Sequence, residues 1–384
     1  MRNYLLSIII PTKNREEYAY CAIKQIMGLN DERIQLVVHD NSDNNSLNQL
    51  LKKEKYNNLT YIHNTEELSA VENFNCALSY AQGEYICMIG DDDGILSNII
   101  DTVQWMKSNG IDAVKPIKNI VYHWPKSLMG KNKNNATLKI YHCKKKMHKM
   151  NTEAAVKRLL QEGGQKYTEY DLITAYHCII KKERMDEVKA RTGQCFGGVS
   201  PDIYNAVCLS LLPYINAYYV GVPVSISGIC KASTSADSAE GKHFGRLEEV
   251  SHLKNIEQYS WDCDIPRIYS VETVWAETAL KAIKDMQRED LRQFFNKKKL
   301  LQLLYKNNYK HFREINEILG ENIDFSKKIG MIRIKKVIRK EMTKIYIFLR
   351  KLVRIDRVYS NVQDIQQAHA ILLKYTKKWR GIFE

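Results

Sequence analysis

Glu84-Tyr85-Ile86-Cys87-Met88-Ile89-Gly90-Asp91-Asp92-Asp93-Gly94-Ile95-Leu96 combines an apolar run with three consecutive carboxylates. The run is typical of a buried strand, and the carboxylates follow directly where that strand ends. Adjacent like charges repel, so a folded protein keeps them at a strand end when a cation neutralises them. A ligand set of oxygens alone favours Mg²⁺ or Mn²⁺ over Zn²⁺. The alternative is a solvated acidic turn, since Asp and Gly are common turn residues.

Three earlier apolar runs resemble buried strands, and each of them ends in polar residues. They are Ser7 to Pro11, Ile34 to His39 and Leu59 to His63, and a helical pattern from Glu16 to Met27 separates the first two. Strands that alternate with helices in this way predict an α/β fold with a mainly parallel sheet flanked by helices. Ligands of such sheets bind beyond the carboxyl ends of the strands. Asp40 and the Asp triplet are therefore expected to face one crevice.

The chain has 384 residues, of which 44% are hydrophobic, enough for one large domain with an appendage. Its character changes near residue 245, where helical patterns with few Gly or Pro begin. We expect helices over 247–259, 271–286 and 290–307. The predicted division is a domain of residues 1–245 followed by a helical appendage of residues 246–384.

Four motifs, in order along the chain, resemble those of the family 2 glycosyltransferases, which have the nucleotide-sugar-binding GT-A fold. Ser7 to Arg15 resembles the first strand and nucleotide loop of that family, and Val37 to Ser42 resembles its second strand. Residues 72–86 resemble the helix and strand that lead into the acidic DXD motif, which is Asp91 to Asp93 here. The resemblance covers residues 5 to about 235. Many members carry an Arg near position 72, where this chain has Val71 and Glu72, so no arginine contact to phosphate is inferred there.

The resemblance implies a nucleotide-sugar donor site on these motifs. Asp40 would accept a hydrogen bond from the base, and Asp91 and Asp93 would bind the metal, Asp93 most directly. Asp92 is a further candidate, because the longer acidic motif of the family aligns with positions 92 and 93. The residues expected to contact the donor are Pro11, Thr12, Asn14, Arg15, Asp40, Asn73, Asp91 and Asp92.

Gly197 to Tyr204 resembles the segment that presents the catalytic carboxylate in this family, which makes Asp202 the expected general base. The same residues also suit a helix start, with Ser200 as N-cap, Pro201 at the first helical position and Asp202 near the positive end of the helix dipole. Both interpretations can hold together. A carboxylate at a helix start is held rigidly, which suits a base that meets an acceptor hydroxyl.

The implied reaction is a single inverting displacement with no covalent sugar intermediate. A metal would stabilise the charge on the departing nucleotide diphosphate. A positioned carboxylate base contributes roughly 100- to 10,000-fold to such a rate. We expect a UDP-sugar donor and a glycan or lipid-linked oligosaccharide acceptor, in surface polysaccharide biosynthesis.

Residues 327–354 carry eleven Lys or Arg and one acidic residue, Glu341, so most of the net charge of +14 lies there. Apolar residues recur at helical spacing in this segment, and a basic amphipathic helix is typical of contact with anionic lipid. The alternative is a helix packed on the protein with a solvated basic face. Nine scattered cysteines without a Cys-x-x-Cys pair favour reduced thiols. We expect a cytoplasmic protein, peripheral at the inner face of a membrane.

Three other functions are less consistent with the sequence. A basic nucleic-acid-binding protein is disfavoured, because the acidic triplet repels phosphate and no recognised binding module is present. A sugar nucleotidyltransferase usually has a Gly-rich phosphate loop after its first strand, and Pro11 to Arg15 lacks glycine. A degenerate binding protein that keeps the fold without turnover is disfavoured by the presence of both Asp202 and the triplet.

Overall fold

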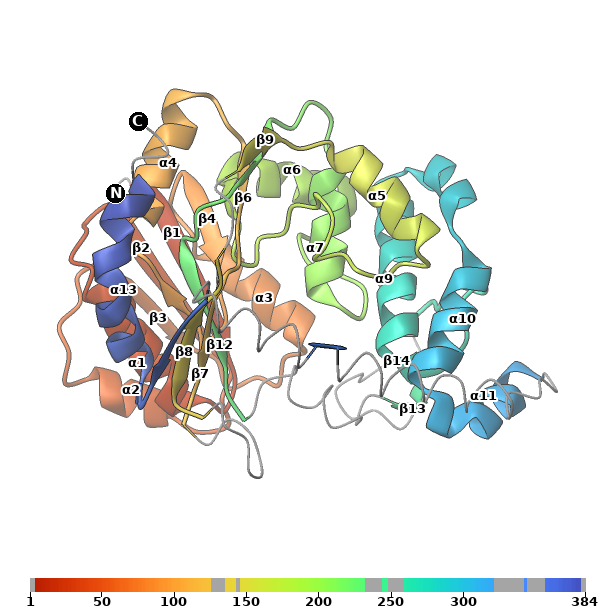
Figure 1. Cartoon of the computed structure of the whole chain (residues 1–384), viewed down its shortest axis with the longest axis horizontal. Coiled ribbons are helices and arrows are strands. Elements are labelled where there is room, and N and C mark those ends of the chain that lie inside the picture. The colour runs from red at the N-terminus through yellow and green to blue at the C-terminus, as the bar shows by residue number, and fades with distance from the viewer. Residues whose placement is uncertain are drawn as a thin grey trace.

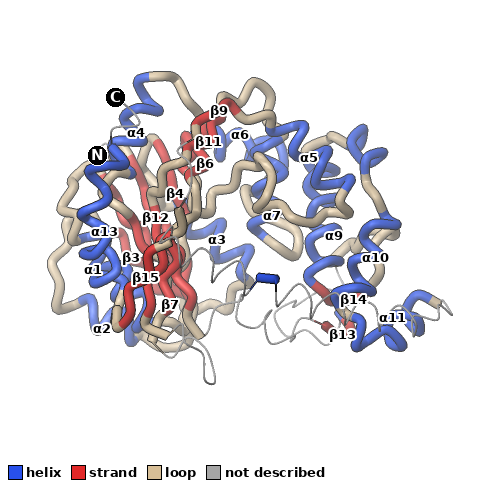
Figure 2. Tube along the Cα trace, in the orientation of Figure 1, coloured by secondary structure: helices blue, strands red, loops and turns tan. Residues whose placement is uncertain are grey.

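The computed structural model describes residues 4–125, 135–142, 146–231, 244–247, 259–320, 342–343 and 356–380. Strands gather in one part of the molecule and helices form most of the other part (Figures 1 and 2). The basic segment 327–354 lies outside the described residues, apart from Met342 and Thr343. Its predicted contact with a membrane therefore stays a prediction.

The central sheet has eight strands in the order β3-β2-β1-β4-β10-β6-β11-β9. The first four are parallel to one another, as the sequence predicts. β1 and β2 are buried along their whole length, because helices cover both faces. These four strands are β1 (Leu6–Thr12), β2 (Ile34–Asp40), β3 (Leu59–His63) and β4 (Tyr85–Met88).

The other half of the sheet contains an antiparallel strand, β10 (Ile179–Lys181), between β4 and β6 (Ala113–Pro116). Because β10 is antiparallel to both neighbours, β6 runs in the same direction as β4. β11 (Ala217–Val220) is parallel to β6, and β9 (Met147–Lys149) pairs with β11 at the edge. Residues 175–180 are a largely apolar run, but regular pairing begins only at Ile179. Tyr176 and His177 precede it at the edge where β4 ends.

Alternate residues of β1 enter two separate cores. Ile8 and Ile10 pack in the cluster that contains Ile23 of α1. Ile9 packs on the opposite face, in the cluster that contains Ala77 and Ile203. This explains why the strand is apolar at consecutive positions. The helices of this part are α1 (Glu16–Met27), α2 (Ser46–Leu51), α3 (Ala70–Ser79), α4 (Ile99–Ser108), α5 (Thr152–Gln161), α6 (Lys182–Thr192) and α7 (Pro201–Ser210).

A second sheet has the order β15-β8-β7-β12-β5 and includes the C-terminal part of the chain. β15 pairs with β8, and α13 (Ile365–Arg380) contacts α1 and β5. Figure 1 shows α13, in dark blue, beside α1. Residues 356–380 thus lie against the first part of the chain, while the predicted division at residue 245 stays a prediction. The strands are β5 (Gly94–Ile95), β7 (Ile120–His123), β8 (Thr137–Ile140), β12 (Ser225–Ile229) and β15 (Arg357–Ser360).

The helical part begins with a short hairpin of β13 (Phe244–Arg246) and β14 (Ile268–Ser270). α9 (Val271–Asp285) matches the predicted helix and packs on α7. The single helix expected over 290–307 is wrong, because Phe295 is extended and divides the segment. Asn296 then caps the second piece by accepting a hydrogen bond from the Lys299 N–H. The remaining elements are η2 (Glu289–Phe294), α10 (Lys297–Asn307), η3 (Tyr309–His311) and α11 (Phe312–Leu319).

The predicted fold class is confirmed: a mainly parallel sheet flanked by helices, followed by further helices. Within the described ranges, no helix is both long enough and apolar enough to cross a bilayer.

Candidate active site

The carboxyl ends of β1 and β4 bring three predicted donor-site residues together. Thr12 donates its hydroxyl to Asp91 Oδ2 at 2.6 Å, and Arg15 Nη1 lies 3.0 Å from Asp91 Oδ1. β1 pairs with β4 in parallel register, so the residues that follow the two strands meet at one edge of the sheet. Asp91 is 4% exposed, and it faces the loop that the sequence predicted as the nucleotide loop.

The loops after β1 and β2 are joined by hydrogen bonds. Asn14 donates its backbone N–H to Ser42 Oγ at 2.7 Å and its amide to Asp43 Oδ2 at 2.8 Å. Its φ of 56° lies in the left-handed region, which Asn tolerates better than most residues. Asp40 is fully buried and accepts from Ser42 N–H and Tyr61 OH. These contacts fix Asp40 and Asn14 relative to each other.

Two other predicted donor-site residues, Asn73 and Pro11, are buried and contact other parts of the protein. Asn73 bonds to His39 Nδ1 at 2.7 Å and donates to the Thr12 carbonyl at 3.2 Å. Pro11 is buried in β1 opposite His39. Both residues therefore support the loop that carries Thr12 and Arg15. Their predicted contact with the donor stays a prediction.

Asp93 is the most heavily bonded carboxylate of the triplet. It accepts from the backbone N–H groups of Gly90 and Gly228, both at 2.7 Å, and from Tyr176 OH at 3.0 Å. His177 Nε2 lies 3.2 Å from the same carboxylate. Burial opposes its ionisation, but His177 and the N–H donors stabilise the negative charge, so the pKa of Asp93 is lowered. Asp93 anchors the turn, and its predicted direct contact with a metal stays a prediction.

Asp92 has fewer donors and a very different charge state. The Cys230 N–H donates to Asp92 Oδ2 at 3.1 Å, and Trp124 Nε1 donates to its backbone carbonyl at 2.9 Å. Burial, and then the charges of Asp93 and Asp91, raise the pKa of Asp92 to about 8. Gly228 is required beside it, since a Cβ there would lie 1.8 Å from the Asp92 carbonyl oxygen.

The triplet fits a divalent cation by its chemistry. Burial raises the pKa of Asp91 despite the opposing charge of Arg15, as it does for Asp92, so the protein alone does not stabilise the ionised forms of these two carboxylates. The three do not each place an oxygen within 4.8 Å of the others; among the described residues only Asp262, Cys263 and Asp264 meet that test. Mg²⁺ normally takes one or two carboxylates and completes its shell with substrate phosphates and water. Two triplet members together with a diphosphate satisfy that pattern.

The cluster at Asp262 and Asp264 has another explanation. Arg292 bonds to both Asp262 oxygens, at 2.8 and 2.7 Å, and to Asp264 at 2.6 Å. Lys297 also reaches Asp264, at 3.3 Å. The cluster is therefore neutralised by the protein itself.

Asp202 lies in the first turn of α7, as predicted, with Pro201 at the first helical position. Ser200 occupies the N-cap position, but its side chain makes no capping hydrogen bond, so the predicted cap is wrong in this respect. Asp202 Oδ1 is enclosed and has no hydrogen-bond partner among the described residues. Burial raises the pKa of Asp202 to about 6, and the positive charge of Lys118 opposes this rise.

Tyr176 is bonded to the triplet and is also affected by the charge of Asp202. Burial raises the pKa of Tyr176, and the charges of Asp93, Asp92 and Asp202 raise it further. Asp202 is therefore close enough to Tyr176 for its charge to act on the phenol, whose hydroxyl bonds to Asp93 at 3.0 Å.

Sequence reasoning missed Tyr176 and His177. His177 is 3% exposed, has a left-handed φ of 64°, and joins Ser225 Oγ at 2.8 Å to Asp93. The available signal was two polar side chains inside the apolar run 175–180. A strained, buried histidine that reaches an acidic motif is a mark of a functional site.

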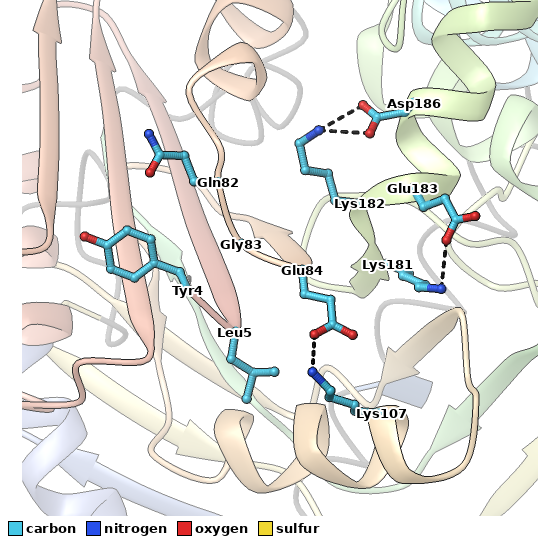
Figure 3. Close-up of a pocket in the computed structure, with 10 residues that line it drawn as sticks. All are labelled: Tyr4, Leu5, Gln82, Gly83, Glu84, Lys107, Lys181, Lys182, Glu183 and Asp186. Atoms are coloured by element: carbon cyan, nitrogen blue, oxygen red, sulfur yellow. Dashed lines mark hydrogen bonds and ion pairs between the residues drawn. The ribbon is translucent and has the colours of Figure 1, made fainter. Parts of the chain in front are cut away.

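A cavity of about 490 Å³ lies at the opposite, amino end of the sheet (Figure 3). Its three lysines each meet a carboxylate: Lys107 with Glu84, Lys181 with Glu183 and Lys182 with Asp186. None of the predicted site residues lines it. Its full lining is Tyr4, Leu5, Gln82, Gly83, Glu84, Lys107, Lys181, Lys182, Glu183 and Asp186.

Residues 7–156 match the family model described as Glycosyl transferase family 2. This part of the chain is a family 2 glycosyltransferase domain. It contains the loops after β1 and β2 and the whole triplet, which confirms the resemblance inferred from those motifs. Asp202 lies beyond the matched region. The match also disfavours the nucleotidyltransferase and nucleic-acid-binding alternatives.

Curated relatives are similar to this chain over different lengths. The abequosyltransferase RfbV of Salmonella typhimurium is 22% identical over 321 residues, which are 76% of this chain and 89% of RfbV. A Campylobacter jejuni protein named GalNAc(5)-diNAcBac-PP-undecaprenol beta-1,3-glucosyltransferase is 29% identical over 108 residues, 27% of this chain and 35% of that protein. Four curated relatives, this one included, match over 33% to 43% of their own length.

Solved structures also resemble the chain. The structure of Staphylococcus aureus TarS residues 1–349 in complex with UDP-GlcNAc has a TM-score of 0.43 and 14% identity. The similarity covers 76% of this chain and 72% of that chain.

Proposed function

We propose that the chain is a metal-dependent, inverting glycosyltransferase that moves a sugar from a nucleotide-diphosphate sugar to a glycan or lipid-linked acceptor in surface polysaccharide biosynthesis. One observation carries the proposal. A family 2 domain brings Thr12, Arg15 and Asp91 into contact at the carboxyl edge of its sheet. At that edge Tyr176 bonds to Asp93, and the charge of Asp202 acts on the same tyrosine. These observations support donor and acceptor groups that act at the same edge of the sheet.

On the donor side, the joined loops after β1 and β2 present Asp40, Asn14 and Arg15 to the nucleotide. Mg²⁺ or Mn²⁺, when bound, stabilises charge on the departing diphosphate. Asp91 and Asp92 would hold it, since the protein stabilises their ionised forms less than that of Asp93. Asp93, which the sequence favoured for direct coordination, is occupied by four protein donors and keeps the turn in place. A UDP-sugar is the first donor to test.

On the acceptor side, Asp202 would remove the proton from the attacking hydroxyl. With a pKa of about 6, its carboxyl is mostly ionised at pH 7 and can accept that proton. The absence of a hydrogen-bond partner at Oδ1 among the described residues leaves an acceptor atom for the substrate hydroxyl. A proton held at Asp202 requires no covalent sugar intermediate, in keeping with inversion.

The proposed acceptor class follows from relatives. The Campylobacter protein is named for a diphosphate-linked undecaprenol substrate, and a lipid-linked acceptor would account for the basic segment 327–354. We propose a cytoplasmic protein, peripheral at the inner face of a membrane. Removal of residues 327–354 should then reduce binding to anionic liposomes, and unchanged binding would contradict membrane docking.

The function is tested by screening UDP-, GDP-, dTDP- and CMP-sugars for binding and slow hydrolysis, with Mn²⁺, Mg²⁺ or a chelator. We expect one donor to bind in a metal-dependent manner, and binding to weaken in Asp92→Asn. Asp202→Asn should bind that donor as the wild type does but fail to transfer. Binding of no donor would instead support a degenerate fold.

A further inference from the structure

Lys118 reaches the active-site edge because of the sheet topology. β6 runs in the same direction as β4, so the residues after β6 emerge at the edge where β4 delivers the triplet. Lys118 is two residues beyond the end of β6, and its side chain is exposed. A cation therefore stands at the edge of the sheet that carries Asp91 to Asp93.

Lys118 lies beside Tyr176, a residue that is bonded to the acidic triplet. Its Nζ lies 5.6 Å from the ring centroid of Tyr176, and the hydroxyl of the same tyrosine bonds to Asp93 at 3.0 Å. The positive charge of Lys118 also stabilises the ionised form of Asp202. Among the described residues, no carboxylate lies within 4.0 Å of its Nζ. The ammonium is thus exposed and forms no ion pair within the described ranges.

The neighbouring Lys115 differs in each of these respects. Its Nζ donates to the backbone carbonyls of Tyr170 and Thr168, and burial lowers its pKa. Lys115 is committed to holding a loop. Of the two lysines, only Lys118 has no carboxylate or carbonyl partner for its ammonium within the part of the chain that the structure describes.

We propose that Lys118 binds a phosphate group of a substrate during sugar transfer, an inference that rests on the proposed function. An ammonium with free donors is a common phosphate ligand. Two sources supply this chemistry: the diphosphate that leaves the donor, and the diphosphate that would link a lipid to the acceptor. Lys118 lies beside Tyr176, which bonds to the acidic turn proposed for the donor, and its charge acts on Asp202, the group proposed for the acceptor.

The test compares Lys118→Met with Lys107→Met in the full-length protein by calorimetry with Mn²⁺. Lys107 is a matched control, since it is also exposed but pairs with Glu84 at the far end of the sheet. The donor probes are UDP, GDP and dTDP against their nucleosides. The acceptor probes are farnesyl diphosphate against farnesol.

We expect Lys118→Met to weaken binding of one diphosphate class by about tenfold or more, because a charge-assisted hydrogen bond is lost. The nucleosides and farnesol should bind as before, and Lys107→Met should change nothing. Loss of nucleoside diphosphate affinity assigns the donor phosphate, and loss of farnesyl diphosphate affinity alone assigns the acceptor phosphate.

Two results would overturn the inference, and they can be told apart. Unchanged affinity of Lys118→Met for both diphosphate classes, when the wild type binds them, would show that Lys118 serves only to neutralise Asp202. A wild-type protein that binds none of the diphosphates would overturn the proposed function as well.

Discussion

The two ends of the central sheet use charged residues in opposite ways. At the carboxyl edge, three carboxylates are buried side by side, each no more than 5% exposed. At the amino edge, Lys107, Lys181 and Lys182 each meet one carboxylate in a partly exposed pair (Figure 3). Exposed pairs contribute about 0–1 kcal/mol and need no ligand. Carboxylates that are buried side by side resist ionisation, and a bound cation can stabilise their ionised forms.

The supporting structure differs in the same way. The turn of the carboxyl edge is held by the second sheet, through Gly228 and Cys230 N–H groups and through β5. α13 from the end of the chain packs behind it, since Ile365 touches Gly94. The amino edge relies on local pairs on β4, α4 and α6. The carboxyl edge is therefore distinguished by the long-range contacts that hold its unfavourable cluster of acidic residues in place.

Asp202→Asn should have the largest effect on transfer. Loss of a general base costs roughly 100- to 10,000-fold in rate, because the acceptor proton no longer has a carboxylate to receive it. Steady-state kinetics with the identified donor and acceptor measures this. Donor affinity should remain, as the change is confined to the acceptor side.

The matched comparison for this variant is Asp285→Asn, a carboxylate in the helical part that pairs with Lys281 and accepts from Tyr204. It should keep its transfer rate at a temperature where it is folded. Equal loss in both variants would mean that Asp202 acts through stability alone.

Much of this arrangement was predictable from the sequence. Continuous apolar runs predicted β1 to β4, and the family resemblance assigned Thr12, Arg15 and Asp91 to one donor site, where the structure brings them into contact. The roles of Tyr176 and His177 were not predictable, because they depend on β10 running antiparallel beside β4 and on a left-handed φ at His177. Likewise, no local pattern shows that residues 357–380 return to β8, β5 and α1. Long-range pairing decides these features.

Gln25→Met should have the next largest effect, this time on stability. The buried Gln25 amide donates to the Ile95 carbonyl and accepts from the Ile95 N–H, both at 2.9 Å, so it acts as a neighbouring strand for β5. Methionine would leave both backbone groups unpaired, at a cost of about 1–3 kcal/mol for each. Urea unfolding measures the loss, and nucleotide affinity should fall with it.

Gln49→Met is the control, since Gln49 is exposed on α2. Its free energy of unfolding should change by only about 0.5 kcal/mol or less. Similar losses in the two variants would show that the amide of Gln25 is not the support of the acidic turn.

The pH dependence of stability tests directly whether burial disfavours the ionised form of Asp92. The folded-state pKa of Asp92 is about 8, whereas an unfolded Asp titrates near about 3.9. Between these values the folded state holds a proton that the unfolded state has released, so stability falls as pH rises through this window. Without metal, the melting temperature of the wild type should therefore fall more from pH 5 to pH 8 than that of Asp92→Asn. Parallel curves would contradict the assignment.

Added Mn²⁺ sharpens the same measurement. At pH 8 the ion should raise the melting temperature of the wild type more than that of Asp92→Asn, because a carboxylate ligand is lost in the variant. An equal rise in both proteins would return the direct ligand role to Asp91 and Asp93.

Lys182→Met should have the smallest effect, although it removes a full charge from the cavity shown in Figure 3. Lys182 Nζ lies 2.9 Å from Asp186 Oδ2, one helical turn away, and both side chains are partly exposed. Pairs of this kind contribute about 0.3–0.5 kcal/mol. Unfolding in urea should shift by no more than that, and nucleotide-sugar affinity should not change. A large loss of donor affinity would contradict the difference between the two edges, because it would show that the cavity at the amino edge takes part in donor binding.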